Sequence, residues 1–407
     1  AAAAGALYVS AENAQFDNLF GGPMVVEVIV KDPNRSMTNE NAGEPTVMVD
    51  NQQLRMAQGL DGNWYGYFAD STDVADVAND GSQLEFGTAD DPDVGGILGH
   101  ASLATFDDTT YRSQLALGGT AGANAADFAG VIDNAPELSN WNGTNASSCT
   151  SCGQIGINST NWPFLQTFDF TQEDFDVILE QAGTDEVVTL EHNNNDLDDY
   201  ASLTLDRSSA TQGAEVMLFI VDQQLNIDPT DEDVIVFKVP HNGSSTSAAV
   251  AWTNGTIPWE FTASGAMTAF VDAGTGHGFS DNGKLLIDMN AAGATVNVLA
   301  KDATADDTVT ATTALFTYLV FFEDADNTGT FSNVDDDDDA NLEVKSLAKR
   351  GTTATFDYND SAQSFTVAND FGTIDMDESS VGDEWNSGEN LVVTLADQDL
   401  NKNTLND

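Results

Sequence analysis

The sequence predicts an all-β protein in which similar units follow one another along the chain. Short β-branched runs are separated by turn signals such as Gly-Pro and Asp-Gly, and no helical period of useful length appears in residues 201–350. Strands of this length and spacing are typical of a β-sandwich or a barrel. One strand-and-loop pattern also recurs at long intervals, which indicates tandem domains rather than a solenoid, whose repeats are shorter.

The recurring pattern is a strand that runs into an acidic loop. In each copy a β-branched run begins after a glycine or proline, and nine residues later an aspartate opens a polar loop. The copies lie at residues 23–36, 213–231 and 388–403, and their opening aspartates are Asp32, Asp222 and Asp397. No return strands follow the third loop before residue 407, so we expect the chain to be the N-terminal part of a longer protein.

These signals divide the chain into three predicted domains. The first spans residues 1–200 and carries an insertion at 71–165, which is rich in Ala, Gly, Asp and Asn and poor in β-branched runs. The second spans 201–350, and the start of a third, truncated β domain spans 351–407. Within the first domain, residues 171–183 have a capping-box start and a glycine stop, which favours a short helix or the crossover turn of a sandwich.

The expected strands are short throughout. In the first domain they lie at 7–10, 25–30, 45–50 and 63–68. The run at 25–30 does not alternate cleanly with polar residues, so we expect it to be buried on both faces. In the second domain strands are expected at 201–206, 216–221, 234–239, 270–271, 285–287, 296–299 and 315–322.

The charge of the chain is extreme. It has 67 Asp and Glu against 12 Lys and Arg, a formal net charge of −55 at pH 7. Such a chain repels nucleic acid and anionic lipid headgroups, attracts cations, and repels itself on compaction unless counterions or bound metal offset the charge. Hydrophobic residues make up 41%, so this is not a disordered acidic tail. The alternative explanation is a solvated surface adapted to a salty habitat.

Acids recur at the same place in each copy of the repeat, and in the last copy they have the spacing of a calcium site. In the last loop Asp397, Asp399, Asn401 and Asn403 occupy alternate positions, and Asp407 follows. Calcium takes 6–8 oxygen ligands of these types. The loop lacks the glycine and the final glutamate of an EF-hand, so we expect a calcium loop on a β scaffold. The alternative is an Asx-rich turn that holds its own backbone.

A second acidic stretch, residues 322–342, is interrupted by apolar residues that suggest an ordered loop; the alternative is a solvated charge run. We therefore predict several calcium sites. The candidate metal ligands are Asp222, Asp228, Asp231, Asp233, Glu323, Asp324, Asp326, Asn327, Asp335, Asp337, Asp397, Asp399, Asn401, Asn403 and Asp407.

The only cysteines are Cys149 and Cys152. Zinc would need two further ligands, and a thioredoxin-like site would need the pair to open a helix, whereas the surrounding composition is that of a loop. A short structural disulfide in an oxidising compartment is the favoured interpretation. The Ala-rich start fits the product of signal-peptide cleavage, and the longest apolar run, at 314–322, is far too short to span a membrane.

Enzyme motifs are weak. None of the four histidines pairs at metal-ligand spacing, no Gly-x-Ser-x-Gly elbow is present, and the glycine-rich run at 274–278 lacks the lysine of a phosphate loop. We therefore expect a non-enzymatic protein and no catalytic residues. A salt-adapted hydrolase is kept as a third hypothesis, because paired carboxylates among so many acids depend on geometry.

Residues 44–70, which include the run from Asp61 to Phe68, resemble the N-terminal domain of surface-layer (S-layer) proteins from ammonia-oxidising archaea. Residues 225–233 and 369–385 are similar to later repeats of that family. The resemblance covers most of the chain. It implies immunoglobulin-like β-sandwich domains, secretion, and assembly into a two-dimensional lattice that coats the cell.

The expected function is therefore structural: an acidic, calcium-stabilised S-layer subunit at the cell surface, whose main partner is itself. Its negatively charged pores would attract metal cations and small cations such as ammonium. The alternative is a cell-surface adhesin or filament subunit of stacked immunoglobulin-like domains, with the insertion at 71–165 as its recognition module. No nucleic-acid partner and no membrane span are expected.

Overall fold

The computed structural model shows an all-β protein. It describes residues 6–22, 24–71, 83–84, 104–105, 135–139, 154–155, 162–170, 173–226, 228–230, 232–238, 259–263, 284–288, 296–298, 300–301, 308–309, 318–334, 338–340, 342–377 and 384–405. Within these ranges the helices are short: α3 (Asn194–Asp198) has five residues, and the 3-10 helices η1 (Ala14–Phe16), η4 (Gln223–Leu225) and η5 (Gln398–Leu400) have three each. The other regular elements in these ranges are strands.

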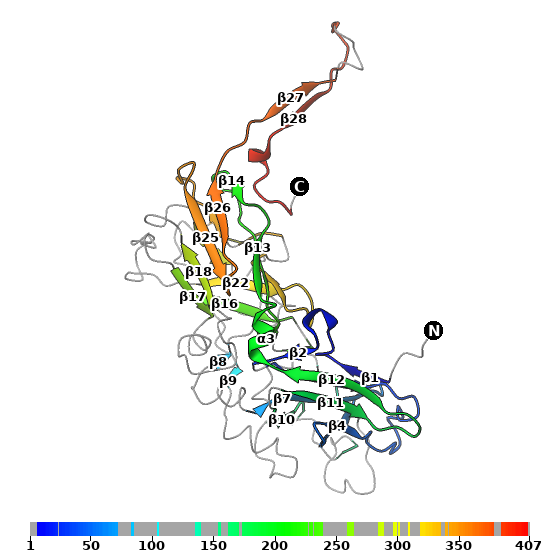
Figure 1. The fold of residues 1–407 in the computed structure, drawn as a ribbon. Helices are drawn as coiled ribbons and strands as arrows, with labels where there is room; N and C mark the ends of the chain where they lie inside the picture. Colours follow the sequence, from blue (N-terminus) through cyan, green and yellow to red (C-terminus); the bar gives the residue numbers. More distant parts are fainter. Residues whose placement is uncertain are drawn as a thin grey trace.

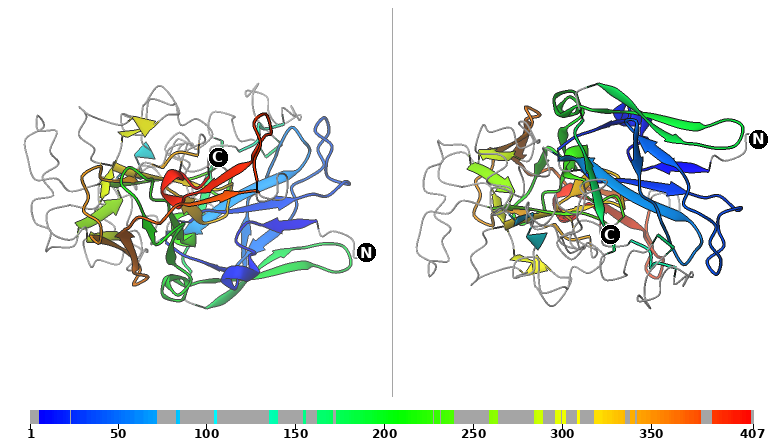
Figure 2. Two further views of the ribbon diagram at one scale, coloured as in Figure 1. Left: turned by 90° about the horizontal axis from the view of Figure 1, so that it is seen from above. Right: turned by 90° about the horizontal axis from the view of Figure 1, so that it is seen from below.

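Two sheets of five strands, here called the N-terminal sheets, form the first part of the molecule (Figure 1). The first has the order β1 (Leu7–Val9), β3 (Val26–Val30), β7 (Trp64–Asp70), β10 (Leu165–Phe168), and β6 (Ala57–Gln58) also pairs with β7. The second has the order β2 (Leu19–Phe20), β12 (Glu186–His192), β11 (Asp174–Leu179), β4 (Val47–Val49), β5 (Gln52–Leu54). Figure 2 shows β11 and β12 in one layer and β3 and β7 in the other.

A single hydrophobic core joins the two sheets, and its members come from both. Phe20 lies at its centre, with its ring 6.1 Å from Phe68, 5.6 Å from Phe170 and 5.9 Å from Phe175. Edge-to-face aromatic packing of this kind adds stability beyond the area it buries. The expectation that the strand near 25–30 is buried on both faces is confirmed, since four of the five residues of β3 are buried.

The expectation of a short helix or crossover turn at 171–183 was wrong, because this segment contains strand β11. Phe175, Val177 and Leu179 are buried, whereas Asp174 and Asp176 are exposed. This is the period of two that a strand with one buried face requires. The burial of three large apolar side chains outweighs the local capping signal.

A ten-stranded sheet forms the second part. Its order is β13 (Ser202–Leu205), β15 (Leu218–Val221), β23 (Thr330–Ser332), β22 (Tyr318–Glu323), β16 (Val234–Lys238), β17 (Trp259–Ala263), β18 (Lys284–Asp288), β25 (Thr353–Tyr358), β26 (Gln363–Val367), β14 (Ser209–Ala210). Because β13 contacts β25 and β26 near the far end of this order, the sheet curls back on itself. Residues 353–367, assigned from the sequence to the third domain, pair within this sheet.

Smaller pairs complete the described structure. They are β8 (Gln83–Leu84) with β9 (Ala104–Thr105), β19 (Val296–Val298) with β24 (Leu342–Val344), β20 (Ala300–Lys301) with β21 (Thr308–Val309), and β27 (Thr373–Met376) with β28 (Val393–Ala396). The last pair, here called the terminal hairpin, extends away from the rest of the molecule (Figure 1). In the described residues no helix is long and apolar enough to cross a membrane. The strand expected at 270–271 and most of the insertion at 71–165 lie outside the described residues.

Candidate functional site

The aspartates that open the three repeated loops all make the same turn. Each side chain accepts a hydrogen bond from the backbone N–H two residues later, which is an Asx turn. A carboxylate placed there ends the strand, because it satisfies a backbone donor that would otherwise need a ladder partner. The donor–acceptor distances are 2.9 Å from Asn34 N to Asp32, 2.9 Å from Gln224 N to Asp222, and 3.0 Å from Asp399 N to Asp397.

The second loop, which follows β15, is the buried copy of this turn. Asp222 is 1% exposed, and its second carboxylate oxygen accepts a hydrogen bond from the Tyr358 hydroxyl. The adjacent Gln224 is fully buried, and its side-chain amide donates to the carbonyl of Asn194 at 2.9 Å and to the Asp198 carboxylate at 3.1 Å. The loop therefore ties the ten-stranded sheet to α3, which follows the N-terminal sheets in the chain.

The third loop, which follows β28, makes the corresponding connection. Asp399 stands where Gln224 stands in the second loop, and its carboxylate accepts from the side chain of Asn369 at 3.0 Å and from the backbone N–H of Asp370 at 2.9 Å. In the second loop Gln224 contacts residues 194–198, just before β13, the strand that pairs with β15. In the third loop Asp399 contacts residues 369–370, just before β27, the strand that pairs with β28. We call this contact between an acidic loop and the segment before the partner strand the joint.

Further hydrogen bonds hold the third loop against the ten-stranded sheet. The Arg207 guanidinium donates to the carbonyls of Asn401 at 2.9 Å and Lys402 at 2.6 Å, and the N–H of Glu215 donates to the same Lys402 carbonyl at 2.8 Å. The side chain of Asn403 donates to the carbonyl of Asp338 at 2.6 Å. The side-chain amide nitrogen of Asn403, one of the predicted metal ligands, thus donates to a protein acceptor.

The acidic stretch between β22 and β23 is also organised by backbone donors. One oxygen of Glu323 accepts from the N–H groups of Thr328 at 2.6 Å and Gly329 at 2.7 Å, and the other accepts from the N–H of Asp233 at 3.0 Å. Asp233 in turn accepts from the N–H of Asp228 at 3.0 Å. Burial raises the pKa of Glu323 to about 7 even though these hydrogen bonds lower it.

The predicted metal ligands therefore divide into groups. Of the described carboxylates, those of Asp222, Asp228, Asp233, Glu323, Asp397 and Asp399 accept backbone N–H hydrogen bonds. Asp324 and Asp326 are exposed on the loop after β22. In the part of the chain that the structure describes, no three Asp, Glu, His or Cys side chains are grouped so as to hold a metal ion. Asp231, Asp335, Asp337, Asp407, Cys149 and Cys152 lie outside the described residues. The calcium sites and the disulfide stay predictions.

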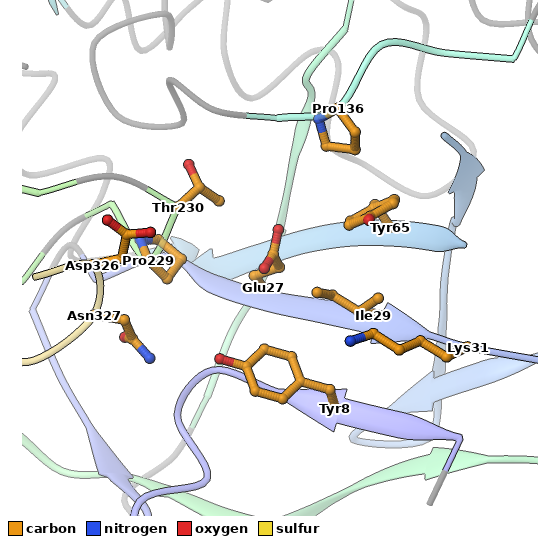
Figure 3. Close-up of a pocket in the computed structure, with 10 residues that line it drawn as sticks. All are labelled: Tyr8, Glu27, Ile29, Lys31, Tyr65, Pro136, Pro229, Thr230, Asp326 and Asn327. Carbon is orange, nitrogen blue, oxygen red and sulfur yellow. The ribbon is translucent and has the colours of Figure 1, made fainter. Parts of the chain in front are cut away.

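A pocket of about 370 Å³ lies between the first N-terminal sheet and the loops of the second part (Figure 3). Because side chains alternate along β3, Glu27, Ile29 and Lys31 share one face of the sheet. Tyr8 and Tyr65 flank Ile29 on the neighbouring strands. The lining residues are Tyr8, Glu27, Ile29, Lys31, Tyr65, Pro136, Pro229, Thr230, Asp326 and Asn327.

Sequence analysis missed Glu27, a buried carboxyl group that lines this pocket. Burial raises its pKa to about 7, opposed by the Tyr67 side chain and by the charge of Lys31. The available signal was a lone glutamate inside a run of valines, which is unusual for a strand buried on both faces.

The back of the pocket is a direct contact between the two parts of the molecule. The side chain of Asn327 donates to the carbonyl of Ser10 at 3.0 Å, and its oxygen accepts from the side chain of Asn226 at 3.0 Å. Glu27 therefore lies beside a surface where the acidic loops of the second part meet β1 and β3.

No protein-family model matches the sequence, and a search of curated proteins gives no match either.

The raised pKa of Glu27 predicts a pH effect with a definite sign. A carboxyl with a higher pKa in the folded protein holds its proton there, so stability falls as pH rises from about 4.5 to about 7. Replacing Glu27 by Gln removes this term. The free energy of unfolding of Glu27→Gln relative to the parent should rise by about 2 kcal/mol between pH 5 and pH 8.

Urea unfolding at both pH values measures this difference. Glu12→Gln is the matched control, because Glu12 is exposed and belongs to the same part of the molecule. If Glu27→Gln shows the same pH dependence as the control, Glu27 does not keep its proton in the folded protein.

Proposed function

We propose that the chain is a structural subunit of a secreted two-dimensional surface layer and has no enzymatic activity. The observation that carries this proposal is the joint, which recurs with the same Asx turn and the same backward contact after β15 and after β28. A chain that repeats its connector as well as its strands is suited to building an extended, mechanically continuous array. The resemblance of residues 44–70, 225–233 and 369–385 to S-layer proteins of ammonia-oxidising archaea supports the same function.

In this proposal the units are immunoglobulin-like β-sandwich domains in tandem. The first comprises the N-terminal sheets, the second comprises the curled ten-stranded sheet, and the terminal hairpin opens a third. The segments that the loops contact at the joints lie at about residues 194–201 and 368–372, just before β13 and β27, and we place the domain boundaries there. A boundary at residues 368–372 leaves β25 and β26 in the same domain as the strands with which they pair.

Cations are required by the charge of the chain. With 67 acids and 12 basic residues, the folded subunit repels itself and its neighbours unless counterions accumulate. We propose calcium as the stabilising ion, held by the acidic loops and by contacts between subunits. A calcium ion between two subunits would take some of its oxygen ligands from each chain, so one subunit alone would not need to hold a complete set of ligands.

The assembly test is direct. The purified chain at low ionic strength should form a periodic two-dimensional array when calcium is added, as seen by electron microscopy, and the array should disperse in excess EDTA. Calcium that binds only the folded protein stabilises it by roughly 2.7 kcal/mol per site at 100-fold over Kd, so the melting temperature should also fall on chelation.

Re-addition of calcium is the control for damage by the chelator. Isolated fibres instead of sheets would favour the adhesin or filament alternative. An unchanged melting curve in EDTA would remove calcium from the proposal, and turnover of peptides or glycans by the pure protein would favour the hydrolase.

The charge also predicts how assembled layers treat small ions. Pores lined by carboxylates attract cations, including ammonium, over a range set by the Debye length, about 8 Å at physiological ionic strength and about 3 Å at 1 M. Isolated layers should therefore retain monovalent cations over anions at low salt and lose this preference as salt rises. Equal retention of cations and anions at low salt would show that the charge serves only solubility.

A further inference from the structure

The pocket between the two parts of the molecule has a buried acid at its inner end (Figure 3). Glu27 and Tyr65 are 8% and 9% exposed, so they lie deep in the pocket. Tyr8, Lys31 and Asp326 are exposed and belong to its entrance. A cavity of about 370 Å³ is large enough for a small organic molecule. Its inner end offers such a molecule one carboxyl group and one aromatic ring.

The protein itself satisfies the Glu27 carboxyl group poorly. In the part of the chain that the structure describes, no basic side chain forms an ion pair with it. Tyr67 lies opposite Glu27 in the strand register and acts on the carboxyl group from nearby, but the buried Tyr67 hydroxyl makes no hydrogen bond of normal length. A carboxyl group buried in this way keeps its proton unless a cation lies beside it. Glu27 therefore faces the cavity with a place for a positive charge.

The walls around this place are aromatic and aliphatic. Tyr8 on β1 and Tyr65 on β7 are both in register with Ile29 on β3, so the three side chains stand on the face of the sheet that carries Glu27. Figure 3 shows the two rings on either side of Ile29, with Pro229 of the second part facing them. The face of a tyrosine ring attracts a cation, most strongly where water is excluded. The aliphatic side chains would pack against the carbon atoms of a ligand.

A bare metal ion suits this lining less well than an organic cation does. Calcium takes 6–8 oxygen ligands, whereas Glu27 and Asp326 are the carboxylates among the lining residues. About 10–15 Å³ of cavity already holds one water molecule, so a single ion would leave most of the 370 Å³ to solvent. The Lys31 ammonium group also lines the pocket and opposes the entry of a double charge. The lining therefore favours one positive charge carried by a molecule with several carbon atoms.

We propose that this pocket binds a small organic cation of the alkylammonium class, with its charge beside Glu27 and its carbon atoms against Tyr8, Tyr65 and Ile29. Asp326 adds to the attraction at the entrance, whereas Lys31 competes with the ligand as a second cation. Such binding is selective, unlike the diffuse attraction of an acidic surface, which acts on all monovalent cations alike. The site depends on the geometry of the pocket alone and is independent of the surface-layer proposal.

Tetramethylammonium is the probe for this site, because it carries one charge inside a shell of methyl groups. It is titrated into the full chain by calorimetry in about 0.15 M sodium chloride, which limits the diffuse attraction of the acidic surface to a range of about 8 Å. We expect saturable 1:1 binding. Two control ligands, potassium chloride and the neutral compound tert-butanol, should give no saturable signal at the same concentrations.

Four variants, each checked for folding by circular dichroism, locate the bound cation. Glu27→Gln removes the charge with little change of shape and should weaken binding about tenfold or more. Tyr8→Leu removes a ring at an exposed position and should weaken it about threefold or more. Lys31→Gln removes the competing cation, also at an exposed position, and should strengthen it about twofold or more. Glu12→Gln is the control for loss of one exposed acid and should change it by less than about twofold.

Three results would overturn the proposal. One is the absence of saturable binding of tetramethylammonium. Another is equal binding of potassium or of tert-butanol, because the protein would then recognise charge alone or apolar volume alone. The third is binding that Lys31→Gln weakens, or that Tyr8→Leu and Glu27→Gln leave unchanged, since the cation would then lie outside the pocket.

Discussion

The structure depends on a buried carboxylate at the end of a strand and on the hydrogen bonds that make its burial tolerable. An ionised carboxylate without partners is strongly destabilising in a protein interior, so its oxygens must be occupied. Asp222 meets this requirement with the N–H of Gln224 and the hydroxyl of Tyr358. The first bond shapes the turn, and the second ties it to β25. The turn then directs Gln224 onto α3, and the two parts of the molecule are joined as a consequence.

The other buried acids of this chain also need partners for their carboxylate oxygens. Twelve basic residues cannot pair with 67 acids, so ion pairs such as Arg55 with Glu44, at 2.9 Å, neutralise only a small share. The buried acids are instead stabilised by backbone N–H groups, as at Glu323, or by retaining a proton, as the raised pKa of Glu27 implies. Exposed acids such as Asp324 and Asp326 remain in contact with water instead. Burial and exposure thus assign two different roles to one residue type.

Several features of the fold were predictable from the sequence because they depend on local patterns. Turn signals and β-branched runs located β1, β3, β4 and β7, and the nine-residue interval located the repeated loops. Strand β11 was missed because a capping box describes only the first turn of a segment, whereas three inward side chains decide its conformation. The pairing of residues 353–367 with β18 and β14 involves contacts distant in sequence, which periodicity does not report.

The candidate site was predictable only in part. Alternating oxygen ligands such as Asp397 and Asp399 indicate a polar loop, but metal ions and backbone amides satisfy carboxylates equally well, and spacing does not distinguish them. In the described loops the amides take these oxygens. The pocket beside Glu27 depends on how two separate parts meet, and no local pattern encodes that meeting.

A double-mutant cycle between Asp222 and Tyr358 tests the central claim most directly, with Asp397→Ala as the control for the same turn in a half-buried setting. Loss of the half-buried turn should cost about 1 kcal/mol. Asp222→Ala should cost about 2–4 kcal/mol, because it also leaves a buried hydroxyl without its partner. The cycle with Tyr358→Phe should show a coupling of about 1 kcal/mol or more. Additive effects, together with equal costs for Asp222→Ala and Asp397→Ala, would contradict the dependence of the joint on the buried carboxylate.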